Sequence, residues 1–284
     1  MPRTDWGWMI TPEELRSWFV FHDHGILAID KPAHVLCHRS KHGPWSSLIS
    51  ACRELTGAPR MHMPSRLDRE TSGALVIVSS RAALDAVNLA VRRGYFAKTY
   101  HAIVTGVLTG PVLVDQPIGV AEASVVGVRR AVRPDGQPAR TLFEPLAATA
   151  SHTFVRATPL TGRTHQIRVH ASWLGHAVAG DKIYGPDENL FVEFLRTGWT
   201  PGLQESLSIE RHALHCSTFH WNDPAAPRRF FAPLPLDWRE FAGSLGFDWS
   251  DLERLSRDGV TAPGAVTPPN AVTSGTVVSS HEQT

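Results

Sequence analysis

The chain has 284 residues, of which 42% are hydrophobic and 19% are charged, so it can bury one large core or two small ones. The net charge is only +1, but residues 51–175 hold 15 of the 28 Lys and Arg against 8 of the 27 Asp and Glu. A basic middle between acidic ends favours a phosphate-binding face, with ordinary unevenness along the chain as the alternative.

The cysteines and the apolar runs indicate the cellular compartment of the protein. Cys37, Cys52 and Cys216 are odd in number and widely spaced, which favours reduced thiols over a disulfide framework. No apolar run approaches the ~18 residues of a membrane span, and the N-terminus has no apolar signal segment. We therefore expect a soluble, cytoplasmic monomer that has no membrane partner.

The first 24 residues are predicted to form an N-terminal extension with one short helix. Thr11 is a candidate N-cap, Pro12 suits the first helical position, and Glu14 closes a capping box. This pattern predicts a helix from residue 12 to about residue 20. A strand at 26–30 and a second helix at about 45–55 are expected to follow.

The densest group of charges comes next, in the stretch RLDRETSG at 66–73. It precedes the apolar run 74–78, whose length and β-branched residues predict a buried strand. Arg66 and Arg69 flank Asp68, and nearby cations favour the ionised form of a carboxylate. An ionised and well-oriented Asp68 can act as a nucleophile. The alternative is a surface turn with a local ion pair.

The segment after this strand is predicted to be a helix that begins at Ser80 and ends at Gly94. A strand from about residue 96 then places Lys98 and Tyr100 on one face, because side chains alternate along a strand. Tyr100 is a candidate site residue, and an ordinary half-buried tyrosine is the alternative.

Residues 110–158 are predicted to form β-hairpins, including strands at 112–114, 125–132, 141–143 and 152–157. Arg129 and Arg130 lie in this region and are candidates to bind a phosphate backbone. The alternative is that these arginines only increase solubility.

A second dense stretch, TGRTHQIRVH, covers residues 161–170. Thr164 is predicted to cap a helix that ends near residue 174, with an apolar face toward the core. Arg168 lies beside that face and needs an anion, because an unpaired buried charge is costly. We expect Asp68 to be this anion, about a hundred residues earlier in the sequence.

The C-terminal third gives no sign of a metal site. Four candidate ligands are too far apart along one predicted strand to meet at one ion, and no Cys-x-x-Cys is present; they are His212, His215, Cys216 and His220. Strands at 213–221 and 230–232 and a helix from Asp237 are expected. Residues 256–284 are rich in Gly, Pro, Ser, Thr, Val and Ala without periodicity, which predicts a disordered tail.

Five blocks of residues, in this order, resemble the pseudouridine synthases of the RluA type. The resemblance extends from Ile26 to Trp238, and the second and fourth blocks are long and specific. The blocks are 30–32 (DKP), 66–73 (RLDRETSG), 98–102 (KTYHA), 161–170 (TGRTHQIRVH), and 214–215 (LH) with 232–235 (APLP).

The resemblance implies an α+β fold with a mixed, largely antiparallel central sheet flanked by helices, and an active site in a cleft across the sheet. Residues 25–250 would form this catalytic domain. The implied reaction is the isomerisation of uridine to pseudouridine in structured RNA, either rRNA or tRNA, with no cofactor or metal. The target uridine would be flipped out of any helix to reach the site.

The resemblance also implies roles for three residues. Asp68 matches the catalytic aspartate, Tyr100 the tyrosine that lies against the target base, and Arg168 the basic residue that pairs with the aspartate. Asp68 would act either as a nucleophile at C1′ or as a base at C2′. Residues expected to contact RNA are Arg66, Arg69, Lys98, Arg129, Arg130, Arg163 and His165.

Two departures from the family pattern bear on substrate choice rather than on chemistry. Ser65 stands where the family usually has His before Arg-Leu-Asp, and His34 stands where it usually has Gly after Lys-Pro. Two other functions remain possible from the sequence. One is a non-catalytic RNA-binding protein on the same scaffold, and the other is a nucleosidase or glycosidase, which would need a second carboxylate such as Glu70.

Overall fold

The computed structural model describes residues 3–4, 7–38, 42–222, 227–258 and 271–272. The helices that it describes are α1 (Pro12–Ser17), the 3-10 helix η1 (Pro44–Ser46), α2 (Leu48–Thr56), α3 (Arg81–Arg92), α4 (Gln166–Trp173), α5 (Asn189–Thr197), α6 (Pro201–Leu207), α7 (Asp237–Ser244) and α8 (Trp249–Arg257). None of these helices is long and apolar enough to cross a membrane.

A ten-stranded mixed sheet forms the centre of the fold. Its strands are β3 (Phe19–Asp23), β4 (Ile26–Lys31), β5 (Ser72–Val78), β6 (Phe96–Thr105), β7 (Val112–Asp115), β10 (Arg140–Ala148), β11 (His152–Pro159), β12 (Leu214–Trp221), β13 (Arg228–Phe231) and β14 (Ala271–Val272). Two short hairpins lie outside it: β1 (Arg3–Thr4) with β2 (Gly7–Trp8), and β8 (Ile118–Val120) with β9 (Arg130–Val132).

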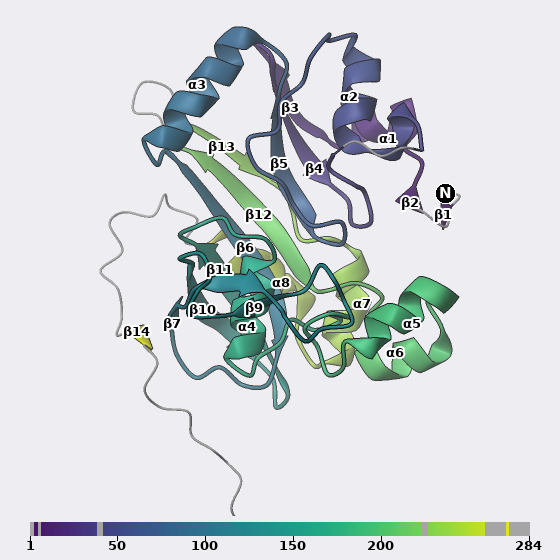
Figure 1. The fold of residues 1–284 in the computed structure, drawn as a ribbon, viewed down its shortest axis with the longest axis vertical. Helices are drawn as coiled ribbons and strands as arrows, with labels where there is room; N and C mark the ends of the chain where they lie inside the picture. Colours follow the sequence, from purple (N-terminus) through teal and green to yellow (C-terminus); the bar gives the residue numbers. More distant parts are fainter. Residues whose placement is uncertain (1–2, 5–6, 39–41, 223–226, 259–270, 273–284) are drawn as a thin grey trace, which may run out of the picture.

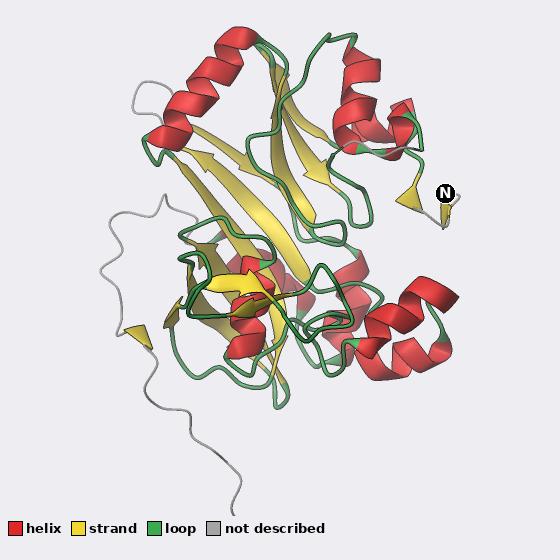
Figure 2. Ribbon diagram, in the orientation of Figure 1, coloured by secondary structure: helices red, strands yellow, loops and turns green. Residues whose placement is uncertain are grey.

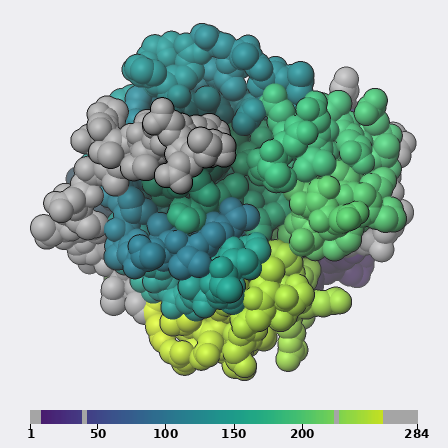
Figure 3. Space-filling model, turned by 90° about the horizontal axis from the view of Figure 1, so that it is seen from below, coloured from purple at the N-terminus to yellow at the C-terminus, as the bar shows by residue number. Residues whose placement is uncertain are grey.

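The order across the sheet is β14-β7-β10-β11-β6-β12-β5-β4-β3, with β13 paired to β12 (Figure 1). Pairings are antiparallel except β5 with β12 and β7 with β14. Helices lie on the flanks of the sheet (Figure 2). Seen from below, α5 and α6 form one side of the molecule (Figure 3). The predicted α+β fold with a largely antiparallel sheet is confirmed.

The core lies around β5 and β12, in which every residue is buried. The predicted apolar run at 74–78 is thus an interior strand that is covered on both faces. β12 comes late in the sequence, yet it lies between β5 and β6 and joins the two halves of the sheet. This arrangement brings the residues before β5 close to the face of β6.

Gly73 allows β5 to approach β12 closely. Its φ is +111°, and a Cβ atom built on it would lie 2.2 Å from the carbonyl oxygen of Cys216. A residue with a side chain would meet both the steric conflict and a strained backbone. Gly73 therefore fixes the end of the 66–73 stretch against the central strand.

Several local predictions were wrong. The first helix ends at Ser17 instead of near residue 20, because 19–23 pairs with β4 as an edge strand. Of the strand predicted at 125–132, only Arg130–Val132 forms. His165, with φ +58° and no side-chain capping bond, precedes α4 in place of the predicted cap Thr164. Helices α5 and α6 were not predicted.

The predicted tail at 256–284 falls mostly outside the described residues. Its first residues belong to α8, which extends to Arg257, and Ser256 is buried. The helix persists there because its inner side packs on the body of the protein, with Leu252 also buried. Residues 259–270 and 273–284 are not described.

We expect Gly73→Ala to lower the free energy of unfolding by at least about 2 kcal/mol, since it adds a clash to a strained φ. Gly57→Ala is the matched control, because Gly57 has φ +67° but nothing within 4 Å of an added Cβ. That control should cost only about 1 kcal/mol. Urea unfolding measures both values, and equal losses would contradict the role given to the close approach.

Candidate active site

A cleft of about 750 Å³ lies beside β6, which lines it with Phe96, Lys98 and Tyr100. One wall is the loop 63–68, and the opposite wall is the segment 159–168 that leads into α4. Asp68 lies in this cleft with 28% of its side chain exposed. Among the lining residues, all of which the structure describes, Asp68 is the only carboxylate.

The loop that carries Asp68 is held from beneath through its backbone. Lys31 is fully buried, and its Nζ donates to the carbonyl oxygen of Arg69 at 3.2 Å. Burial lowers the pKa of Lys31 to about 8. The thiol of Cys37 donates to the carbonyl oxygen of Leu67 at 3.2 Å. Two neighbours of Asp68 are therefore fixed, while its side chain stays accessible.

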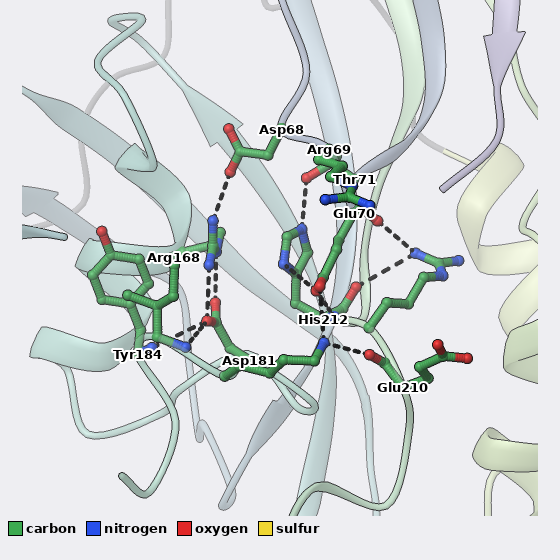
Figure 4. Close-up of polar contacts among 12 residues, drawn as sticks. Asp68, Arg69, Glu70, Thr71, Arg168, Asp181, Tyr184, Glu210 and His212 are labelled. Carbon is green, nitrogen blue, oxygen red and sulfur yellow. Dashed lines mark hydrogen bonds and ion pairs between the residues drawn. The ribbon is translucent and has the colours of Figure 1, made fainter. Parts of the chain in front are cut away.

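Arg168 meets Asp68 as the sequence predicted, with Nη1 donating to Asp68 Oδ2 at 2.9 Å (Figure 4). Its other two contacts go to Asp181, where Nε and Nη2 donate to the two carboxylate oxygens at 2.6 and 2.9 Å. The Arg168 guanidinium also lies over the ring of Tyr184, 4.9 Å from the ring centroid. Bidentate pairing of this kind fixes a guanidinium strongly.

Asp181 is fully buried and is itself well satisfied. Its Oδ1 accepts the backbone N–H groups of Ile183 and Tyr184, both at 3.0 Å. Burial disfavours its charge, but Arg168 and these N–H groups hold the pKa of Asp181 below its ordinary value. The orientation of Arg168 therefore depends mainly on Asp181, and Asp68 binds a cation that is already in place.

His165 links the cleft to the β8–β9 hairpin. Its Nδ1 lies 2.8 Å from the hydroxyl of Tyr184, which accepts the backbone N–H of Arg130 at 2.8 Å. Its Nε2 lies 3.9 Å from Asp68 Oδ2, beyond hydrogen-bond distance. Burial and the charge of Arg168 lower the pKa of His165, so the neutral imidazole predominates at neutral pH.

Lys98 and Tyr100 share the cleft face of β6, as the strand period predicted. Tyr100 is 8% exposed, and burial raises its pKa well above the ordinary value, so its phenol stays protonated. Burial also lowers the pKa of Lys98, whose Nζ lies 5.7 Å from the centroid of the Phe219 ring. An aromatic surface and a cation thus face Asp68 across the cleft.

The structure divides the residues predicted to contact RNA. Four of them line the cleft with Asp68: Arg66, Lys98, Arg163 and His165. Arg69, Arg129 and Arg130 do not line it. Arg129 is committed elsewhere, because its Nη1 donates to Glu188 at 2.7 Å. This pairing was not predicted, since 59 positions separate the two residues.

Glu70 is turned away from the cleft, although it is close to Asp68 in sequence. Lys182 donates to its Oε1 at 2.8 Å, and the backbone N–H of His212 donates to its Oε2 at 3.2 Å. Lys182 also bonds the carbonyl of Glu210. This network, which Figure 4 shows near Asp68 and Arg168, fixes the loop, and among the described residues no second carboxylate lines the cleft.

Sequence reasoning missed Asp181, Lys182 and Tyr184. The run GDKIYG at 180–185, soon after α4, could have indicated them, because it places two charged residues and a tyrosine between two glycines. Gly180 has φ +75°, and an added Cβ would lie 2.4 Å from the carbonyl oxygen of Arg211. Strained backbone positions of this kind cluster at functional sites.

Comparison with known proteins agrees with this geometry. A family model described as RNA pseudouridylate synthase matches residues 25–173. Ribosomal large subunit pseudouridine synthase D of Vibrio vulnificus is 32% identical over 240 residues, which cover 81% of this chain and 70% of that protein. The uncharacterized RNA pseudouridine synthase YjbO of Bacillus subtilis is 34% identical over 77% of this chain and 72% of its own length.

Solved structures show the same fold. Human RNA pseudouridylate synthase domain containing 4 superposes with a TM-score of 0.64 at 24% identity, over 82% of this chain and 95% of that chain. Human RNA pseudouridylate synthase domain containing 1 gives a TM-score of 0.62 at 22% identity, over 84% and 94% of the two chains.

We expect Asp181→Asn to destabilise the protein by about 3–5 kcal/mol, because it leaves the buried Arg168 without its main counter-ion. Asp115→Asn is the control: Asp115 pairs with Arg140 at 3.3 Å, but the two side chains are 46% and 42% exposed. The control should lose less than about 1 kcal/mol in urea unfolding. A similar small loss for Asp181→Asn would mean that other contacts hold Arg168.

Proposed function

Because this chain belongs to the RNA pseudouridylate synthase family, it isomerises uridine to pseudouridine in RNA, and we propose that Asp68 is its catalytic carboxylate. The observation that carries this assignment is the contact of Asp68 with Arg168 at 2.9 Å, in a cleft that it shares with Tyr100. The 25–250 region would then constitute the catalytic domain.

The reaction requires a defined set of bond changes. The bond between N1 of uracil and C1′ of ribose breaks, the base turns, C5 bonds to C1′, the C5 proton leaves, and N1 gains a proton. Asp68 begins this sequence in one of two ways. It attacks C1′ as N1 leaves, and the resulting bond breaks when C5 attacks C1′, or it removes the proton from C2′ as N1 leaves and returns that proton to C2′ when C5 bonds to C1′. Oδ2 is held by Arg168, so Oδ1 is the oxygen best placed for either role.

Arg168 and Tyr100 would perform the supporting roles. Arg168, held by Asp181, keeps Asp68 oriented without having to reorganise during the reaction, which is the usual way an enzyme stabilises changing charge. Tyr100 lines the cleft with a mostly buried ring, and its phenol hydroxyl stays protonated because burial raises its pKa. It would stack on the uracil and keep the detached base from escaping.

We favour ribosomal RNA as the substrate over transfer RNA. The support comes from relatives named ribosomal large subunit pseudouridine synthase C and D, which are 29–32% identical to this chain. A hydrolase that releases free uracil is disfavoured, because such enzymes use a second carboxylate and Glu70 is bound to Lys182 instead.

We expect Asp68→Asn to lower pseudouridine formation at least about 10³-fold, since the amide can neither attack C1′ nor accept a proton. Binding of RNA should change less than about threefold, because phosphate contacts dominate affinity. The assay uses purified protein with large-subunit rRNA and tRNA transcripts, and mass spectrometry of the digested RNA for pseudouridine and free uracil.

The control is Asp85→Asn, which alters an exposed carboxylate paired with Arg81 on α3 and should keep full activity. Pseudouridine formation by Asp68→Asn at the wild-type rate would overturn the role of Asp68. Release of free uracil by the wild type would favour the hydrolase.

A further inference from the structure

The arginines around the cleft differ in whether a carboxylate neutralises them. Two half-buried arginines beside the β8–β9 hairpin each have one: Arg129 pairs with Glu188 at 2.7 Å and Arg133 with Asp135 at 2.8 Å. Arg140, on the neighbouring strand β10, pairs with Asp115. These three arginines therefore offer little free positive charge to an RNA backbone.

The C-terminal end of α3 differs from the hairpin in this respect. Arg92 and Arg93 are exposed, and within the described residues neither has a carboxylate oxygen within 4.0 Å. At the other end of the same helix, Arg81 is neutralised by Asp85 at 3.0 Å. Two adjacent positive charges are therefore unpaired at one end of the helix only.

This end of α3 opens directly onto the cleft. Val91, Gly94 and Phe96 all line it, so Arg92 and Arg93 lie in the chain between residues that line the cleft. Gly94, with φ +67°, ends the helix and turns the chain into β6. Figure 1 shows α3 leading directly into β6, and β6 carries Lys98 and Tyr100, which line the cleft together with Asp68.

The same end offers surfaces that suit nucleotide bases. Tyr95 is half-buried, and the guanidinium of Arg93 lies 5.9 Å from its ring centroid. Val91 is 51% exposed beside them. Aromatic rings with neighbouring arginines are the surfaces on which single-stranded bases stack. We call residues Val91, Arg92, Arg93 and Tyr95 the α3 platform.

We propose that the α3 platform binds the RNA strand that flanks the target uridine, with phosphates on Arg92 and Arg93 and a neighbouring base against Tyr95. The hairpin arginines Arg129, Arg133 and Arg140 would contribute little to this binding. The proposal rests on the RNA substrate of the proposed function. It adds the direction in which the strand leaves the cleft.

A purely structural role for the two arginines gives a different expectation. Cations near a helix C-terminus stabilise the helix by about 0.3–1 kcal/mol through its dipole. That role would change the melting temperature and leave RNA affinity unaltered. The two roles are therefore separable by measuring stability and affinity on the same variants.

The test compares Arg92→Gln/Arg93→Gln with Arg81→Gln, each combined with Asp68→Asn so that the RNA is not modified during binding. The probes are a labelled stem–loop transcript with one unpaired uridine in its loop and a labelled single-stranded oligouridylate. Affinity for each is measured from about 50 to about 300 mM KCl, because the slope of log affinity against log salt reports the number of phosphate contacts.

For the double variant we expect affinity for both probes to fall roughly tenfold, and the slope of log affinity against log salt to become shallower by about 1.4, as for two phosphate contacts on a single strand. Arg81→Gln should leave both quantities unchanged. In the Asp68-containing protein, the double variant should raise KM for rRNA transcript and leave kcat within about twofold.

An unchanged affinity and salt slope in the double variant would overturn the proposal that the α3 platform binds RNA. If its melting temperature were lowered in that case, the role of the two arginines would be to stabilise α3 through the helix dipole. A tenfold loss in Arg129→Gln instead would place the strand on the hairpin and also overturn it. Activity of Asp68→Asn alone would refute the proposed catalytic role, while the binding results would still decide the platform.

Discussion

The buried pair of Arg168 with Asp181 is the interaction on which the site depends. A guanidinium at this depth is tolerated only if its charge and its N–H groups are satisfied, and Asp181 does this with both oxygens. Asp181 in turn is fixed by the backbone turn that follows it, and the residues just before it are tied to the sheet because the N–H of Ala179 donates to the carbonyl of Ile103. Asp68 thus meets a cation that is part of the core.

The residue next to Asp181 fixes the other end of the loop that carries Asp68. Lys182 bonds Glu70, and its Nζ also lies 4.5 Å from the centroid of the Phe194 ring. Two adjacent residues of opposite charge therefore hold the loop at two points, Asp181 through Arg168 at Asp68, and Lys182 directly at Glu70. Asp181 binds the cation Arg168, and Lys182 binds the anion Glu70. Glu70 is therefore held in a structural ion pair, while Asp68 stays accessible from the cleft.

Two parts of this site were predictable from the sequence. The strand period, a local signal, placed Lys98 and Tyr100 on one face, and the cost of an unpaired buried charge called for an anion beside Arg168, for which Asp68 was the candidate. The same argument does not say how many anions Arg168 contacts, so Asp181 was missed, and no pattern in the sequence pairs Arg129 with Glu188. His165 precedes α4 in a left-handed conformation, which is uncommon for any residue other than glycine, so the predicted cap at Thr164 was wrong.

The position of β12 has a consequence for how the enzyme is made. Among the described strands it is the only pairing partner that β5 and β6 share, and it is encoded after every residue of the cleft except Leu214 itself. In a nascent chain that has not yet reached Leu214, the loop of Asp68 and the helix of Arg168 belong to two groups of strands that no described sheet pairing joins. Such long-range pairing forms slowly, so the cleft is among the last parts of the molecule to form, and the unpaired edges of β5 and β6 are exposed until β12 pairs with both.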